Sequence, residues 1–378
     1  MYRLETKVAD AYGPRSPGST NLHTDQLSLV YNKYKSNSAP PQTGIRINLI
    51  FSHGTGMNKS IWKYHIDKLY ASSAKQGWYL DTVVSIDSVN HGDSAVVNDG
   101  KLGPIFRWDE GGKDILQVIK HEQATTGDLK NDYTHRNILI GHSLGGHSSV
   151  LAAFYEPNVV DSVMPVEAVL YYNPQHTERF AKIFGKISAL LIDEFDSYDD
   201  YKEFFTSFSF FKTLHPEVQK VFMEDELLKV VNNNGEVKYR TKASMVNQMA
   251  SYLGSSYSLE LGTKSLENLR VPVCHVIAEN GNWNPKESIP HIRKTIPKEY
   301  LVQTIDMPKG AHLVNGECPD EMTEVIENFI KLRIDDFKEQ ILSIDPEITT
   351  NGDRQKLAEI HKEKLLAGAY RYGYYGKL

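Results

Sequence analysis

Residues 137–146, NILIGHSLGG, decide the fold, because they join an apolar run to a serine that has a glycine two residues away on each side. Residues 137–140 are apolar enough for a buried strand, and residues 148–156, SSVLAAFYE, predict a helix. Residues 141–145 match G-x-S-x-G, in which a sharp strand-to-helix turn exposes the serine hydroxyl. Glycine lets the backbone turn this tightly. The stretch therefore predicts Ser143 as a nucleophile, and the alternative is a glycine-rich turn with an incidental serine.

Further strands and helices alternate along the chain. The predicted strands are 26–34, 45–54, 82–87, 136–142, 161–167, 271–279 and 300–307, and several are apolar enough to be buried on both faces. Helical patterns occupy 59–76, 111–122 and 148–156. Strands that alternate with helices predict an α/β fold, in which a mostly parallel sheet is covered by helices on both faces.

The pattern also divides the chain into segments. We expect a mobile, Ser/Gly/Pro-rich N-terminal arm at 1–25 and a core formed by 26–172 and 267–338. Between the two core pieces, 173–266 are aromatic and acidic with few strand signals, which predicts an inserted helical lid. Residues 339–378 form a C-terminal extension beyond the closing helix of the core.

Composition excludes several classes of protein. The 378 residues carry a net charge of −6 from 48 acidic and 42 basic side chains, without the basic stripe that nucleic acid requires. No secretion signal or transmembrane segment is evident, and Cys274 and Cys318 alone form no disulfide framework, so we expect a soluble intracellular protein. No spacing of His, Cys or Asp indicates a metal site, and no motif calls for a cofactor.

A serine hydroxyl is a weak nucleophile, so the motif requires a histidine base and oxyanion donors. In this fold the base follows the last strand, where residues 308–320, PKGAHLVNGECPD, place His312. Oxyanion donors are expected from the turn after an earlier strand, at 49–57, and from the residue after the nucleophile. The candidates are the N–H groups of Thr55 and Leu144, although the first loop also reads as an ordinary glycine-rich turn.

The carboxylate that orients the histidine has two candidates. In many enzymes of this kind it follows the penultimate strand, where the sequence offers Glu279 slightly early and then Gly281 and Asn282. The other known position is the end of the preceding strand, at Glu167. Both strand ends are adjacent in the expected sheet, so either carboxylate could reach His312, and the choice stays open from the spacing alone.

Five stretches together resemble a known family: 51–62, FSHGTGMNKSIW; 85–103, SIDSVNHGDSAVVNDGKLG; 138–148, ILIGHSLGGHS; 280–285, NGNWNP; and 310–320, GAHLVNGECPD. They are similar to the peroxisomal α/β-hydrolase lipases of budding yeasts. The resemblance implies the α/β-hydrolase fold with a helical lid, and Ser143 as nucleophile, His312 as base and Glu167 as acid. The ending Gly376-Lys377-Leu378 resembles the peroxisomal signal Ser-Lys-Leu except in its first residue. It implies an import receptor as partner and a location in the peroxisomal matrix, or otherwise the cytoplasm.

The expected activity is hydrolysis of a small acyl ester or lipid through a Ser-His-Glu triad and an acyl-enzyme intermediate. The aromatic residues of the lid, such as 204–211, FFTSFSFF, predict an apolar tunnel above Ser143 that suits medium-chain acyl groups. Alternatives are cleavage of a thioester or a carbon–carbon bond by the same triad, or a ligand-binding protein that has lost turnover.

Overall fold

The computed structural model describes residues 2–40, 44–132, 134–231, 235–344 and 354–367. Its centre is an eight-stranded sheet with the order β1-β2-β4-β3-β5-β6-β10-β11. The strands are β1 Tyr2–Asp10, β2 Ser28–Ser36, β3 Arg46–Ser52, β4 Tyr79–Ile86, β5 His135–His142, β6 Ser162–Val166, β10 Val273–Ala278 and β11 Leu301–Met307. The six neighbouring strands β4, β3, β5, β6, β10 and β11 run parallel to one another. Strand β2 is antiparallel to both of its neighbours, β1 and β4. The prediction of a mostly parallel sheet is confirmed.

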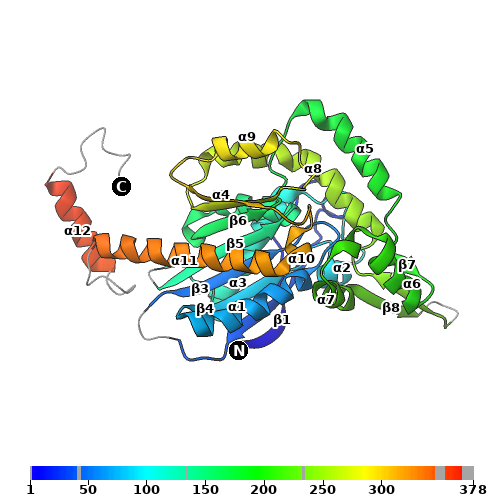
Figure 1. The fold of residues 1–378 in the computed structure, drawn as a ribbon, viewed down its shortest axis with the longest axis horizontal. Coiled ribbons are helices and arrows are strands. Elements are labelled where there is room, and N and C mark those ends of the chain that lie inside the picture. Colours follow the sequence, from blue (N-terminus) through cyan, green and yellow to red (C-terminus); the bar gives the residue numbers. More distant parts are fainter. Residues whose placement is uncertain (1, 41–43, 133, 232–234, 345–353, 368–378) are drawn as a thin grey trace.

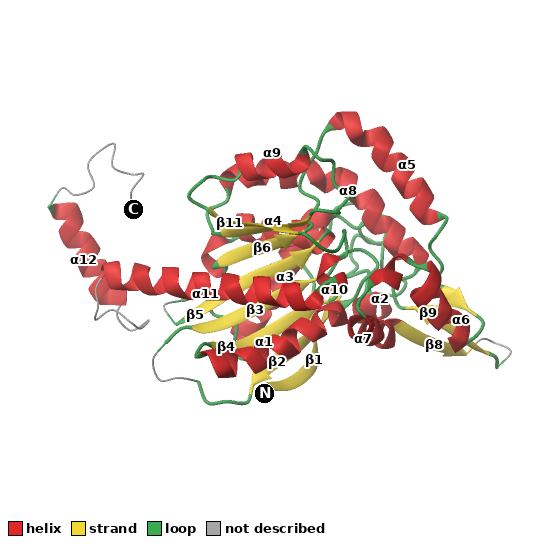
Figure 2. Cartoon of the chain, in the orientation of Figure 1, coloured by secondary structure: helices red, strands yellow, loops and turns green. Residues whose placement is uncertain are grey.

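Helices cover both faces of the sheet, as Figures 1 and 2 show. One face carries α1 (Lys63–Gln76) and α11 (Pro319–Ile344), which pack against each other, and the other carries α3 (Trp108–Thr125) and α4 (Leu144–Tyr155). The shorter helices are α2 Gly92–Val97, α9 Ser288–Thr295 and α10 Val314–Glu317. The continuous apolar runs of the central strands are explained by this arrangement, because β5 and β6 are buried on both sides.

The N-terminal segment differs from the mobile arm expected for residues 1–25. Tyr2–Asp10 form the edge strand β1, which pairs along its whole length with β2. Beyond the strand, the buried guanidinium of Arg15 donates to carboxylates of Glu110 and Asp114 on α3. The Ser/Gly/Pro composition lies only in the connection after β1, and the strand itself was missed.

The inserted segment also differs from expectation, because it is not wholly helical. Its helices are α5 Thr177–Ser188, α6 Tyr198–Glu203, α7 Pro216–Glu226 and α8 Met245–Ser265. A small antiparallel sheet with the order β7-β9-β8 joins them, built from β7 Glu194–Phe195, β8 Leu227–Val231 and β9 Val237–Thr241. These strands are short and only partly buried, in contrast to the continuously buried strands of the core. Figure 1 shows most of this lid grouped beyond one end of the central sheet.

The closing helix α11 continues to Ile344, past the expected core boundary at 338, and α12 (Arg354–Leu366) follows it. Among the helices that the structure describes, none is long and apolar enough to cross a membrane. The predicted targeting tripeptide, 376–378, lies outside the described residues.

Candidate active site

The serine turn connects β5 to α4 and forces Ser143 into an unusual backbone conformation, with φ 53° and ψ −116°. Its N–H donates to the carbonyl of Val166 at 3.0 Å. The flanking glycines are required by close approach: a Cβ on Gly141 would lie 2.3 Å from the Gly145 carbonyl oxygen, and a Cβ on Gly145 would lie 2.5 Å from that of His53. A strained residue held by its surroundings is a common feature of functional sites.

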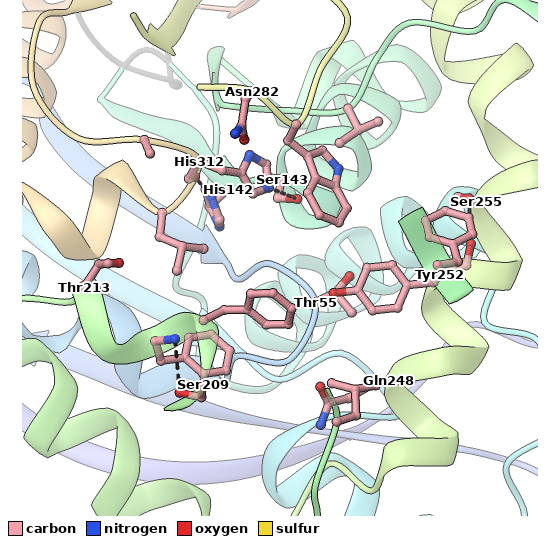
Figure 3. Close-up of a pocket in the computed structure, with 18 of the residues that line it drawn as sticks. Thr55, His142, Ser143, Ser209, Thr213, Gln248, Tyr252, Ser255, Asn282 and His312 are labelled. Atoms are coloured by element: carbon pink, nitrogen blue, oxygen red, sulfur yellow. Dashed lines mark hydrogen bonds between the residues drawn. The ribbon is translucent and has the colours of Figure 1, made fainter. Parts of the chain in front are cut away.

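Three predicted residues meet at this turn. Nε2 of His312 lies 3.0 Å from Oγ of Ser143, and Nδ1 of His312 lies 3.1 Å from Oε2 of Glu167 (Figure 3 shows the first contact). A carboxylate can only accept, so Nδ1 carries the proton and Nε2 is left to accept from the serine hydroxyl. The buried Glu167 also accepts from the Ala278 N–H, at 2.8 Å, which fixes the other carboxylate oxygen.

The second candidate acid lies elsewhere. The side chain of Glu279 is exposed, its N–H donates to the carbonyl of Met307, and no contact joins it to His312 among the described residues. Two residues further on, a Cβ on Gly281 would lie 3.0 Å from both carboxylate oxygens of Glu167. Glycine at position 281 therefore lets the loop after β10 pass close to the carboxylate of Glu167, the residue that follows β6.

The predicted oxyanion donors lie on either side of the serine. Thr55 borders the same cavity as Ser143, and the N–H of Leu144 is the first of α4, a position that has no partner within the helix. The loop that carries Thr55 is held by the Gly56 N–H, which donates to Nε2 of His91 at 2.9 Å. Burial lowers the pKa of His91 well below its ordinary value, so this imidazole stays neutral and can accept.

Two contacts of His312 were not anticipated from the sequence. His142 donates from Nε2 to the carbonyl oxygen of His312 at 2.6 Å, and burial lowers the pKa of His142 to about 3, which keeps it neutral. The ring of Trp283 stacks on the imidazole of His312, with centroids 5.2 Å apart and planes inclined by 16°. In the sequence, the glycine beside His142 marks that residue as part of a turn, and the motif NGNWNP contains Trp283. Neither signal shows that the side chain of the residue is directed toward His312.

A cavity of about 550 Å³ opens above Ser143 (Figure 3). Lid residues supply most of its aromatic wall, and core residues supply its floor. The apolar lining residues are Trp108, Val169, Phe180, Phe184, Leu191, Phe208, Phe210, Phe211, Leu259, Trp283, Ala311 and Leu313. Within the described part of the chain, no three His, Cys, Asp or Glu side chains gather as ligands for a metal ion. The arrangement places a serine hydroxyl, an imidazole and a carboxylate in one chain of contacts beside an apolar binding volume.

Comparison with known sequences gives the family. Residues 49–325 match the pattern of the Alpha/beta hydrolase family. The chain belongs to this family. It is 29% identical over 343 residues to the protein "Peroxisomal membrane protein LPX1" of Saccharomyces cerevisiae, which covers 87% of each chain. It is also 20% identical to "sn-1-specific diacylglycerol lipase ABHD11" of Mus musculus, over 84% of this chain and 89% of that protein.

A solved α/β-hydrolase structure agrees with these relationships. The "Peroxisomal alpha-beta-hydrolase Lpx1 (Yor084w)" from Saccharomyces cerevisiae superimposes with a TM-score of 0.81 and 26% identity. The match covers 98% of this chain and 99% of the other. The resemblance to the peroxisomal α/β-hydrolases of budding yeast, inferred from five short stretches, is confirmed.

Proposed function

We propose that this α/β-hydrolase is a serine hydrolase that cleaves acyl esters through an acyl-enzyme on Ser143. The observation that carries the proposal is the continuous chain of hydrogen bonds from Oγ of Ser143 through the His312 imidazole to Glu167. Each contact joins the atoms that general base catalysis requires, at hydrogen-bond distance.

In the first half of the reaction, His312 takes the proton of Ser143 as Oγ attacks the ester carbonyl carbon. The negative charge that develops on the carbonyl oxygen is stabilised by the N–H groups of Thr55 and Leu144. Glu167 stabilises the imidazolium that forms at this stage. The carbon–oxygen bond of the ester then breaks, and the proton on Nε2 passes to the departing alcohol.

In the second half, water replaces the alcohol beside His312. The imidazole takes a proton from water, the resulting hydroxide equivalent attacks the acyl carbon, and the bond to Oγ breaks. The proton returns to Ser143, so the fatty acid leaves and the enzyme is restored. His142 contributes by holding the backbone carbonyl of His312, which keeps the base in place through both halves.

The cavity supports an apolar acyl group of medium length. Each methylene buried in such a wall contributes roughly 0.8 kcal/mol, so a chain that fills the cavity binds more tightly than acetate. The lipase named among the relatives agrees with this class of substrate.

A series of p-nitrophenyl esters from acetate to octanoate tests the proposal, with Ser143→Ala as the control for spontaneous hydrolysis. We expect kcat/KM to rise with chain length and to require Ser143. A preference for acetate over octanoate would contradict an apolar acyl site, and full activity in the control would contradict the mechanism.

We further propose that the protein is located in the peroxisomal matrix; the names of the yeast relative support the organelle but do not name this compartment within it. The ending Gly376-Lys377-Leu378 is proposed as the signal that the import receptor binds. Fluorescence imaging of the chain with a fluorescent protein fused to its N-terminus, with and without Leu378, tests the proposed location. A diffuse signal from both forms would refute it and leave the proposed chemistry untouched.

A further inference from the structure

Helix α8 presents polar side chains to a cavity whose other walls are mostly aromatic. Gln248, Tyr252 and Ser255 border the cavity together with Ser143, and their spacing of four and three residues puts them on one face of the helix. Figure 3 shows these three side chains along the inner edge of α8. A cavity built only for a hydrocarbon chain gains nothing from such groups, because each must give up water on binding.

The Tyr252 hydroxyl is the most informative of the three. Its ring is held by Phe184, at a centroid distance of 5.4 Å, and by Trp283, at 6.1 Å. Burial raises the pKa of Tyr252 above its ordinary value, so the phenol remains a neutral donor. Among the residues that the structure describes, none forms a hydrogen bond with this hydroxyl. This hydroxyl faces the cavity from a half-buried residue, and a bound molecule that supplies an acceptor would satisfy it.

Gln248 offers the complementary group, one helical turn away. Its Nε2 donates to the carbonyl of Ala243 at 2.9 Å, which orients the amide and leaves Oε1 facing the loop that carries Thr55. A Cβ on Gly56 would lie 2.9 Å from Oε1, so the two elements are in contact. The polar face of α8 therefore offers both a donor and an acceptor.

The mechanism indicates which part of the substrate meets this face. The departing alcohol takes its proton from Nε2 of His312, so it must lie beside that nitrogen. Tyr252 packs instead against Phe184, which belongs to the apolar wall that the proposed ester hydrolysis assigns to the acyl chain. The acyl chain, rather than the alcohol, is the part that runs along α8.

We propose that the preferred acyl group carries a hydroxyl or oxo oxygen, which binds Tyr252 and Gln248 on α8. The inference rests on the proposed ester hydrolysis and names its substrate class: oxygenated medium-chain acyl esters. An oxo group accepts from the Tyr252 hydroxyl, and a hydroxyl group can also donate to Oε1 of Gln248.

The test compares p-nitrophenyl octanoate with the 3-hydroxy, 7-hydroxy and 7-oxo octanoates, which share one leaving group. We expect the wild-type protein to favour at least one oxygenated ester by about tenfold in kcat/KM, because a matched hydrogen bond discriminates strongly in a dry site. Tyr252→Phe should bring that ratio close to one. Tyr257→Phe, on the exposed side of the same helix, is the matched control and should keep the wild-type ratio.

The outcomes separate the two proposals. Hydrolysis of plain octanoate at least as fast as all oxygenated esters would overturn the inference alone, as would an unchanged ratio in Tyr252→Phe. Failure of the wild-type protein to hydrolyse any of the four esters would overturn ester hydrolysis itself, and the inference with it.

Discussion

The serine turn and the attachment of the lid are held together by different kinds of contact. At the turn, backbone lies against backbone so closely that a side chain at Gly141 would collide with the carbonyl of Gly145. The lid is attached through buried charge: Nζ of Lys59 donates to Asp87 at 2.9 Å in the core and to Asp225 at 3.0 Å on α7 of the lid. The first arrangement is local in sequence, whereas the second exists only after folding.

This difference assigns separate roles to the two regions. The turn fixes Ser143 in a backbone conformation that depends on a few adjacent residues. The lid shapes the cavity, and its position depends on Lys59, on Lys242, which reaches Asp93 on α2 of the core, and on the buried carboxyl of Glu226, which accepts from Asn58. Removal of the Ser143 hydroxyl should therefore abolish chemistry with little effect on stability, and substitutions at the attachment should do the reverse.

The largest expected effect is at the turn. Ser143→Ala should lower kcat/KM for p-nitrophenyl octanoate by on the order of 10⁴-fold or more, because the members of such a triad act as a unit. The melting temperature should barely change, since alanine adopts the same backbone conformation. Large destabilisation in this variant would break the comparison, because the turn would then depend on the hydroxyl.

The next effect concerns the acid. Glu167→Gln should reduce kcat by about 10²- to 10⁴-fold with little change in KM, because the carboxylate stabilises an imidazolium that forms only during reaction. Glu279→Gln is the matched control at the exposed site and should retain nearly full activity. Steady-state kinetics on the two variants check this, and the reverse order would assign the acid to the loop after β10.

At the lid attachment, stability should change more than chemistry. Lys59→Met removes a cation that is 2% exposed and leaves the buried carboxylate of Asp87 without a cationic partner, which should cost about 3–5 kcal/mol in the free energy of unfolding. Lys264→Met breaks only the exposed pair with Glu260 on α8 and should cost less than about 1 kcal/mol. Urea unfolding measures both; similar losses would mean that Lys59 does not anchor the lid.

A further effect on stability is a pH dependence at the same junction. Burial raises the pKa of Glu226 to about 8. Hydrogen bonds from the Ala243 N–H and the Asn58 amide lower this pKa, but by less than burial raises it. The nearby charge of Asp87 raises the pKa further, and that of Lys242 lowers it. The folded state then keeps a proton that the unfolded state has lost. Stability should fall between about pH 5 and 8, with a slope of up to ~1.4 kcal/mol per pH unit from this group.

Glu226→Gln removes that titration and should flatten the pH profile of the unfolding free energy over the same range. A variant as steep as the wild-type protein would show that other groups control the dependence. The neighbouring Asp87 is retained in both proteins and serves as a common background.

Local features of the fold and site were predictable from the sequence. The central strands were visible because both faces are buried and the residues are continuously apolar. Ser143 was visible because its turn demands nearby glycines, and His312 because chain order places the base after the last strand. The spacing did not decide whether Glu167 or Glu279 contacts the histidine, because their strands end side by side. In the structure Glu167 contacts His312, and the side chain of Glu279 is exposed.

Features that depend on tertiary contacts were not predictable. The edge strand β1 carries mostly exposed side chains, so it lacks an apolar pattern, whereas the strands of the lid are only two to five residues long, too short for a pattern to distinguish them from neighbouring helices. The stacking of Trp283 on His312 and the anchoring of the lid by Lys59 join residues far apart in the chain. Their residue types are visible in the sequence, but their partners are set by the fold.

The most direct test of the central claim is the reactivity of Ser143 itself. We would treat the wild-type protein and His312→Asn with a fluorophosphonate probe, follow the labelling rate by intact mass, and locate the adduct by peptide mapping. The account predicts a single adduct on Ser143 and a labelling rate lower by on the order of 10³-fold or more in His312→Asn. An adduct on another residue, or equal rates in the two proteins, would contradict it.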